Sequence, residues 1–138
     1  MKNVLSVGMG GILGALARYF IYMPLNSHFF FPWGTMTVNM MGSFFLAFFL
    51  TLALHHFYHR SLLVLSISTG FTGAFTTFSS VSVEMAKMVQ IHPMIALLYV
   101  MASFSAGLLL AYTGRLLGEN VSALIDNRLG LKEEGSVE

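Results

Sequence analysis

The stretch that decides the fold is Gly70-Phe71-Thr72-Gly73-Ala74-Phe75-Thr76-Thr77-Phe78-Ser79-Ser80, in the middle of an apolar segment from about 62 to 89. Glycine weakens a helix by about 1 kcal/mol relative to alanine, and threonine and serine hydroxyls compete for backbone hydrogen bonds. The stretch therefore predicts a break in a membrane helix. Backbone freed inside a bilayer is tolerated only where it is buried in protein or lines a polar cavity, so the break predicts an ion or substrate site. Close helix packing through small residues is the alternative interpretation.

The composition is that of an integral membrane protein. Of the 138 residues, 56% are hydrophobic and 9% are charged, and the mean hydropathy is +0.75, which leaves too few charges to cover a water-soluble domain. The net charge of +1 gives no basic surface for nucleic acid. The absence of cysteine excludes disulfides, thiolate metal sites and cysteine nucleophiles.

The apolar segments predict an all-α membrane protein with four transmembrane helices, the third broken near its middle. The spans are expected at about 4–23, 34–54, 62–89 and 94–117, and together they form a membrane domain over 1–117. A polar tail is expected over 118–138, with a short helix over 121–129.

The first span combines small residues with one costly charge. Its glycines and alanines predict a surface for close helix packing. Arg18 lies near the end of the span, and such a charge is costly unless it is paired, reaches the interface or faces water.

Two polar stripes are predicted on the second and fourth spans. A polar stripe in lipid must face another helix or a cavity, and an asparagine in it offers both donors and acceptors. Hydrogen bonding between helices, without a role in transport, is the alternative interpretation. Each stripe consists of residues four apart on one helix face, which are Thr35, Asn39 and Ser43 in the second span and Tyr99, Ser103 and Gly107 in the fourth.

The charges are distributed unevenly between the two ends of a four-span bundle. The side of both termini carries Lys2, Arg60, Arg115, Arg128 and Lys132, and the opposite side carries Lys87. The positive-inside rule then predicts a multi-pass protein of the cell membrane with both termini in the cytoplasm. Beside Arg60, three histidines at 55, 56 and 59 have no acidic neighbour in the sequence, so they predict a solvated turn rather than a metal site.

Three motifs follow one another, one in each of the first three spans. They are Gly10-Gly11-Ile12-Leu13-Gly14-Ala15-Leu16-Ala17-Arg18-Tyr19, Gly34-Thr35-Met36-Thr37-Val38-Asn39-Met40-Met41-Gly42-Ser43-Phe44, and the stretch from Gly70 to Ser79. Together they resemble the Fluc (CrcB) family of fluoride channels, over residues 4 to about 117. The resemblance implies a channel for passive export of cytoplasmic fluoride. It also implies an antiparallel dimer, in which two subunits insert in opposite orientations.

The resemblance also implies a structural sodium ion at the dimer centre, held by the backbone carbonyls of Gly73 and Thr76. Carbonyls freed from helix hydrogen bonds are hard oxygen ligands that suit a small cation. Arg18 matches the first-span arginine of the family, as a vestibule or structural charge, and Glu84 matches its acidic residue beyond the break.

For the anion, the resemblance implies a pathway of small donors. Asn39 and Thr35 donate hydrogen bonds to fluoride, and Phe78 presents its ring edge, the positive part of the aromatic quadrupole. Tyr99 and Ser103 continue the pathway on the fourth span.

Two features depart from the family pattern. Val81 stands where the family has a second phenylalanine, and its isopropyl group has no quadrupolar edge. The charge bias is also large for a protein that inserts equally in both orientations. Together these features favour a heterodimer with a related, oppositely inserted subunit over a homodimer.

Other classes of function fit less well. An enzyme would need a nucleophile, a base and an orienting group, which the sequence does not offer. A small multidrug-type exporter needs an acidic residue deep in its first span, where this chain has Arg18. Two alternatives remain. One is a sodium-coupled transporter, because such proteins contain broken helices, and the other is a noncatalytic membrane assembly subunit.

Overall fold

The computed structural model describes residues 1–26, 31–56 and 60–129, and helices account for nearly all of them. Four helical segments are long and apolar enough to cross a membrane, by length and composition: Lys2–Leu25, Trp33–His56, Ser61–Val89 and Pro93–Arg128. The prediction of an all-α chain with four such helices is confirmed. The elements are α1 (Lys2–Asn26), α2 (Trp33–His56), α3 (Ser61–Leu65), η1 (Ser66–Thr72), α4 (Gly73–Phe75), α5 (Phe78–Val89) and α6 (Pro93–Leu129).

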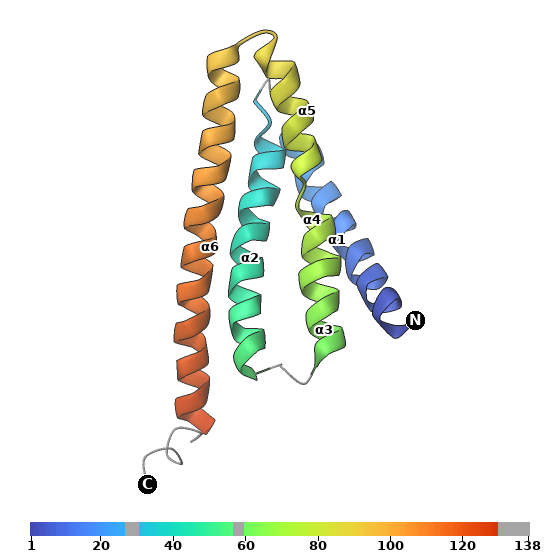
Figure 1. Cartoon of the computed structure of the whole chain (residues 1–138), viewed down its shortest axis with the longest axis vertical. Helices are drawn as coiled ribbons and strands as arrows, with labels where there is room; N and C mark the ends of the chain where they lie inside the picture. Colours follow the sequence, from blue (N-terminus) through green and yellow to red (C-terminus); the bar gives the residue numbers. More distant parts are fainter. Residues whose placement is uncertain (27–30, 57–59, 130–138) are drawn as a thin grey trace.

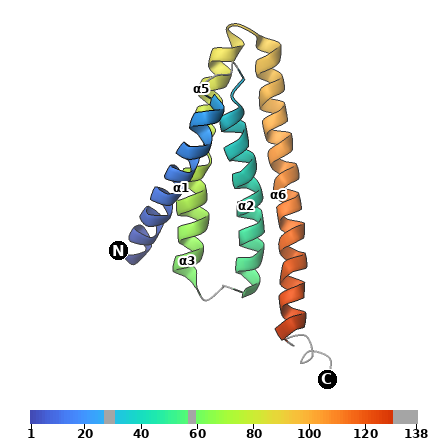
Figure 2. The same cartoon turned by 180° about the vertical axis from the view of Figure 1, so that it is seen from behind.

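In the arrangement of the helices, α2 is the central element. It packs along α6 on one side and beside the segment formed by α3, η1 and α4 on the other, while α1 packs across that segment (Figures 1 and 2). The N-terminus and the C-terminal end of α6 lie toward the same end of the molecule, opposite the turn that joins α5 to α6 (Figure 1). This places the N-terminus and the end of α6 on one side, as an even number of spans requires.

The third apolar segment changes its backbone conformation along its length. It begins as α3, continues as the π-helix η1 and the short helix α4, and reaches Thr76 and Thr77. Thr76 has φ −84° and ψ 159°. Thr77 has φ −150° and ψ 121°, and α5 begins at the next residue. Two extended residues, which we call the link, therefore lie inside the stretch with which the sequence analysis began.

Glycines of α1 permit close contact with this segment. A Cβ atom at Gly10 would overlap the backbone of Ser66, and one at Gly14 would overlap the backbone of Phe71. The Ser66 hydroxyl also donates a 2.7 Å hydrogen bond to the carbonyl of Ser6. The packing surface predicted for the first span is confirmed at these positions.

The C-terminal half of α6 stays packed on α2. The helix runs without interruption to Leu129, so residues 121–129, expected as a separate short helix, are a continuation of the helix that forms the fourth span. His56 Nε2 lies 3.1 Å from Asp126 Oδ1, near the ends of the two helices. The rest of the expected tail, 130–138, lies outside the described residues, as does the histidine at 59.

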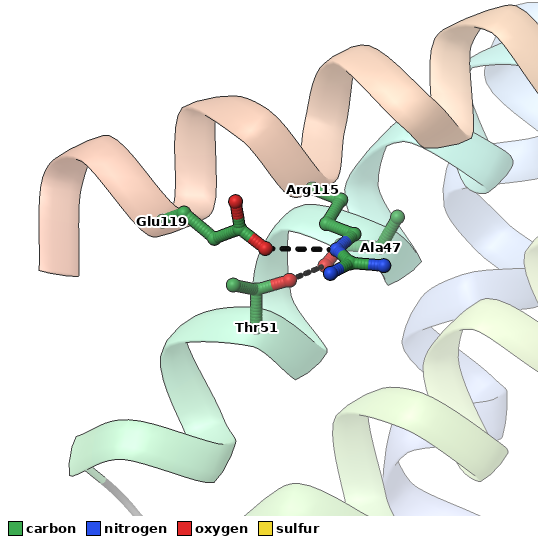
Figure 3. Close-up of polar contacts among 4 residues, drawn as sticks. All are labelled: Ala47, Thr51, Arg115 and Glu119. Atoms are coloured by element: carbon green, nitrogen blue, oxygen red, sulfur yellow. Dashed lines mark hydrogen bonds and ion pairs between the residues drawn. The ribbon is translucent and has the colours of Figure 1, made fainter.

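α6 also carries an ion pair near this contact (Figure 3). Arg115 Nε donates a 2.8 Å hydrogen bond to Glu119 Oε1 one turn further along α6 (Figure 3). Thr51 of α2 lies beside the pair and donates to the carbonyl of Ala47 at 2.8 Å (Figure 3). Because both charged side chains are largely exposed, we expect the pair to contribute little to stability.

Candidate functional site

One side chain of α2 holds the link between α4 and α5. Asn39 Nδ2 donates to the carbonyl of Thr77 at 2.9 Å, and the Thr77 N–H donates to Asn39 Oδ1 at 2.7 Å. The carboxamide thus satisfies both polar groups of one extended residue. Backbone in this conformation has no helical partners of its own, so these two bonds give the link a fixed position against α2.

The hydrogen bonds of the link leave two carbonyls without their usual partners. In a continuous α-helix the N–H of residue i bonds to the carbonyl of residue i−4, so Thr77 would bond to Gly73 and Ser80 to Thr76. Instead the Thr77 N–H bonds to Asn39, and the Ser80 N–H bonds to Thr77 Oγ1 at 3.1 Å as part of the N-cap of α5. Backbone oxygens of Gly73 and Thr76 are thereby released from the helix pattern.

The released carbonyls suit a hard cation better than any side-chain cluster does. Gly73 is exposed, and a Cβ atom there would meet nothing within 4 Å, so its surroundings are open. Within residues 1–26, 31–56 and 60–129, no group of three or more His, Asp or Glu side chains converges to hold a metal ion. Uncharged backbone oxygens fit a monovalent ion such as sodium, and these residues are compatible with the expected site.

An open groove of about 360 Å³ runs beside the link, between α2, α5 and α6. Three residues of the expected anion pathway line it, namely Asn39, Phe78 and Ser103, and so does Val81. The remaining lining residues are Gly42, Ser43, Leu46, Thr72, Thr76, Thr77, Phe104, Gly107, Leu108 and Ala111. None of the lining residues is charged.

The polar groups of the groove differ in how many hydrogen bonds they already make within the chain. Ser103 Oγ is buried and makes no hydrogen bond to the described part of the chain. Asn39 uses one of its two amide hydrogens on Thr77, which leaves a second. Phe78 is 71% exposed, so its ring is accessible to the groove and to the surface. The groove therefore offers compact donors and an aromatic ring.

The other two residues of the expected pathway lie outside the groove and bind a carboxylate. Thr35 Oγ1 donates to Glu84 Oε1 at 2.5 Å, and the Tyr99 hydroxyl donates to Glu84 Oε2 at 2.8 Å. Thr35 and Tyr99 are fully buried. Each lies four residues before a groove residue on its own helix, so the two polar stripes continue from the groove to Glu84.

Beyond this carboxylate lies a second cavity of about 260 Å³, lined by Pro32, Glu84, Lys87, Met88 and Ile91. Its residues Met88 and Ile91 place it near the turn between α5 and α6, which lies opposite the N-terminus and the C-terminal end of α6 (Figure 1). Val81 packs with Met88, Ala96 and Tyr99 in a small hydrophobic core, which lies between the groove and this cavity.

Arg18 is not part of either cavity. It is half-buried on α1, and it makes no hydrogen bond or ion pair with the described residues. The structure therefore does not bring it together with the pathway residues.

Thr77 is the functional position that sequence reasoning missed. It caps α5, its carbonyl accepts from Asn39 Nδ2 and its N–H donates to Asn39 Oδ1, although only its neighbours Thr76 and Phe78 were expected to act. Its signal was the residue type, because threonine is one of the preferred residues at the N-cap of a helix.

Comparison with known proteins gives a consistent result. A family model described as CrcB-like protein, Camphor Resistance (CrcB), matches residues 5–115. A relative from Thermosipho melanesiensis, named fluoride-specific ion channel FluC, is 40% identical over 121 residues, which cover 86% of this chain and 96% of the relative. One from Carboxydothermus hydrogenoformans, named fluoride-specific ion channel FluC 2, is 36% identical over 134 residues, 96% of this chain and 99% of the relative. A third, from Staphylococcus aureus and named fluoride-specific ion channel FluC 1, is 40% identical over 115 residues, 83% and 94% of the two chains.

Proposed function

The chain belongs to the CrcB-like family, and from this membership we propose that it forms a fluoride-specific ion channel. The family consists of membrane ion channels and not of enzymes, so the chain is a multi-pass membrane protein without catalytic activity. The observation that carries the proposal is the uncharged groove lined by Asn39, Phe78 and Ser103.

The chemistry of this groove suits a small, strongly hydrated anion. Such an ion leaves water only where several donors replace its hydration shell. The second amide hydrogen of Asn39 and the hydroxyl of Ser103 are donors of this kind. The edge of the Phe78 ring adds a positive quadrupole without a fixed charge, so an anion is stabilised but not retained.

We place Thr35 and Tyr99 in the continuation of the pathway, where their hydroxyls bind Glu84. An anion that passes this point competes with the carboxylate for the same two donors. Arg18 is proposed as a vestibule or structural charge on α1, away from the groove.

We also propose a structural sodium ion bound by the carbonyls of Gly73 and Thr76. The support is the pair of helix hydrogen bonds that Asn39 and Thr77 replace. The ion would neutralise the partial negative charges of these oxygens and is not itself transported.

The channel is proposed to be an antiparallel dimer that exports fluoride passively from the cytoplasm, with the termini of this chain inside. Val81 in the groove and the charge bias support a heterodimer with a related chain. The numbered names FluC 1 and FluC 2 among the relatives are compatible with organisms that carry two such chains.

A growth experiment tests the proposed function. The chain is expressed in a bacterium that lacks its own fluoride exporter, alone and together with a related chain, and growth is measured in increasing fluoride. We expect resistance with the wild-type chain and loss of resistance with Phe78→Ile at equal membrane levels. Equal sensitivity with and without the chain, in both pairings, would contradict the proposal.

A further inference from the structure

We propose that Asn39 is a positioning residue for the cation site, in addition to lining the groove. Its carboxamide oxygen accepts the hydrogen bond of the Thr77 N–H, so the Gly73 carbonyl stays available to a cation. The inference rests on the proposed sodium ion and names the side chain that assembles its site.

The hydrogen bonds of the link carry this inference. The Thr77 N–H has two possible acceptors, Asn39 Oδ1 as observed and the Gly73 carbonyl as in a continuous helix, and the second requires Thr76 to turn from its extended ψ of 159° to a helical value. A buried N–H requires one of them. When Asn39 is the acceptor, the Gly73 oxygen has no helical donor, and the extended conformation of Thr76 and Thr77 is retained.

The second bond of the carboxamide acts in the same direction. Asn39 Nδ2 donates to the Thr77 carbonyl, so the whole extended residue is tied to α2 and cannot rotate back into the helix without losing both bonds. Removing the side chain leaves the Thr77 N–H free to bond to Gly73, which would extend α4 and occupy one ligand of the cation.

The position of Asn39 also joins the two sites. The same side chain that holds the link lines the groove, so a rearrangement of the link displaces a groove donor. A cation bound at the released carbonyls therefore stabilises the arrangement in which the groove is complete.

The test is the sodium dependence of stability, which does not require transport. Thermal unfolding of the purified full chain is followed in sodium chloride, potassium chloride and N-methylglucamine chloride at equal ionic strength, and the sodium concentration that gives half of the stabilisation is determined. The variants are Asn39→Ala, Asn39→Asp and Thr51→Ala. Thr51 is the matched control because it lies on α2, away from the groove, and loses a hydrogen bond within its own helix.

We expect the wild-type chain and Thr51→Ala to have the same half-saturating sodium concentration. If the competent link falls to about one-tenth of the population in Asn39→Ala, that concentration rises about tenfold. Asn39→Asp keeps an acceptor for the Thr77 N–H but loses the donor to the Thr77 carbonyl, so we expect its value to rise less than that of Asn39→Ala.

Two results would overturn the inference, and a third separates it from the sodium proposal. An unshifted half-saturation in Asn39→Ala would show that the side chain does not position the site. If Asn39→Ala does not fold, Asn39→Asp decides, and a tenfold shift in that variant would contradict the acceptor role. A wild-type chain that does not respond to sodium would overturn the cation site itself, while the growth experiment would still test the channel.

Discussion

Phe78 and Val81 occupy successive turns of α5, and both line the groove, but their surroundings differ. Phe78 is 71% exposed, whereas Val81 is 6% exposed and packs against Met88 and Tyr99. A larger side chain at 81 must therefore displace its neighbours. We expect Val81→Phe to lower the free energy of unfolding by about 1–3 kcal/mol, through overpacking.

The control for this substitution lies two residues away on the same helix. Val83 is 53% exposed, so Val83→Phe should change stability by less than about 0.5 kcal/mol. Chemical unfolding of both variants in the same detergent compares them. Equal effects would show that Val81 is not confined as the structure has it.

Glu84 depends on its two hydroxyl donors. Hydrogen bonds to charged groups contribute about 1.5–3 kcal/mol, so Tyr99→Phe should destabilise the protein by about that amount. Tyr112 is 61% exposed, and Tyr112→Phe is the matched control, with little expected change. If the two variants unfold alike, the carboxylate does not need the Tyr99 hydroxyl.

At the level of residues, the sequence predicted which residues share a helix face better than it predicted their hydrogen-bond partners on other helices. The four-residue spacing put Asn39 and Ser103 each on the polar face of its own helix, and the structure brings the two faces to one groove. It also put Thr35 and Tyr99 on the same stripes, but it could not show that Glu84, on another helix, binds both hydroxyls. Spacing defines a face, whereas a partner depends on how helices are brought together.

The contact between α1 and the third segment depends on glycine. A Cβ atom at Gly14 would overlap the backbone of Phe71, which cannot move aside as a flexible side chain can. We expect Gly14→Ala to separate the two helices and to lower the free energy of unfolding by about 1–3 kcal/mol.

Gly8 is the matched control on the same helix. A Cβ atom there would meet nothing within 4 Å, so Gly8→Ala should stabilise the protein by up to about 1 kcal/mol through helix propensity. The opposite signs of the two changes, measured as shifts of the unfolding midpoint, test the close approach. A stabilising Gly14→Ala would refute it.

At the level of elements, apolar length predicted the four long helices, but not where the last one ends. Polar residues after 117 suggested a tail, yet α6 continues to Leu129 because one face of it still packs on α2. There Ser122 is buried, and Asp126 lies beside His56, which is 70 positions away in the sequence. An acidic partner so distant could not be found next to the histidines.

The orientation of the whole molecule can be tested with cysteines, because the chain has none. Ser61 is exposed at the end of the molecule where the N-terminus and the end of α6 lie, and Gln90 is exposed at the opposite end. In intact cells, we expect a membrane-impermeant maleimide to label Gln90→Cys and to spare Ser61→Cys, as the charge bias predicts.

Equal labelling at both positions would contradict a single orientation. It would mean that this chain inserts both ways and would favour a homodimer over the proposed heterodimer. Labelling of Ser61→Cys alone would reverse the predicted placement of the termini.

The most direct measurement of the central claim is fluoride efflux from liposomes that contain this chain. The purified chain is reconstituted alone and with a related, oppositely oriented chain, and efflux is followed with a fluoride electrode against a chloride control. We expect rapid efflux of fluoride and retention of chloride. A heterodimer gives this result only in the mixed preparation, and a homodimer gives it with this chain alone. Silence in both preparations, or equal release of the two anions, would contradict a fluoride-specific channel and would assign the polar stripes to helix packing.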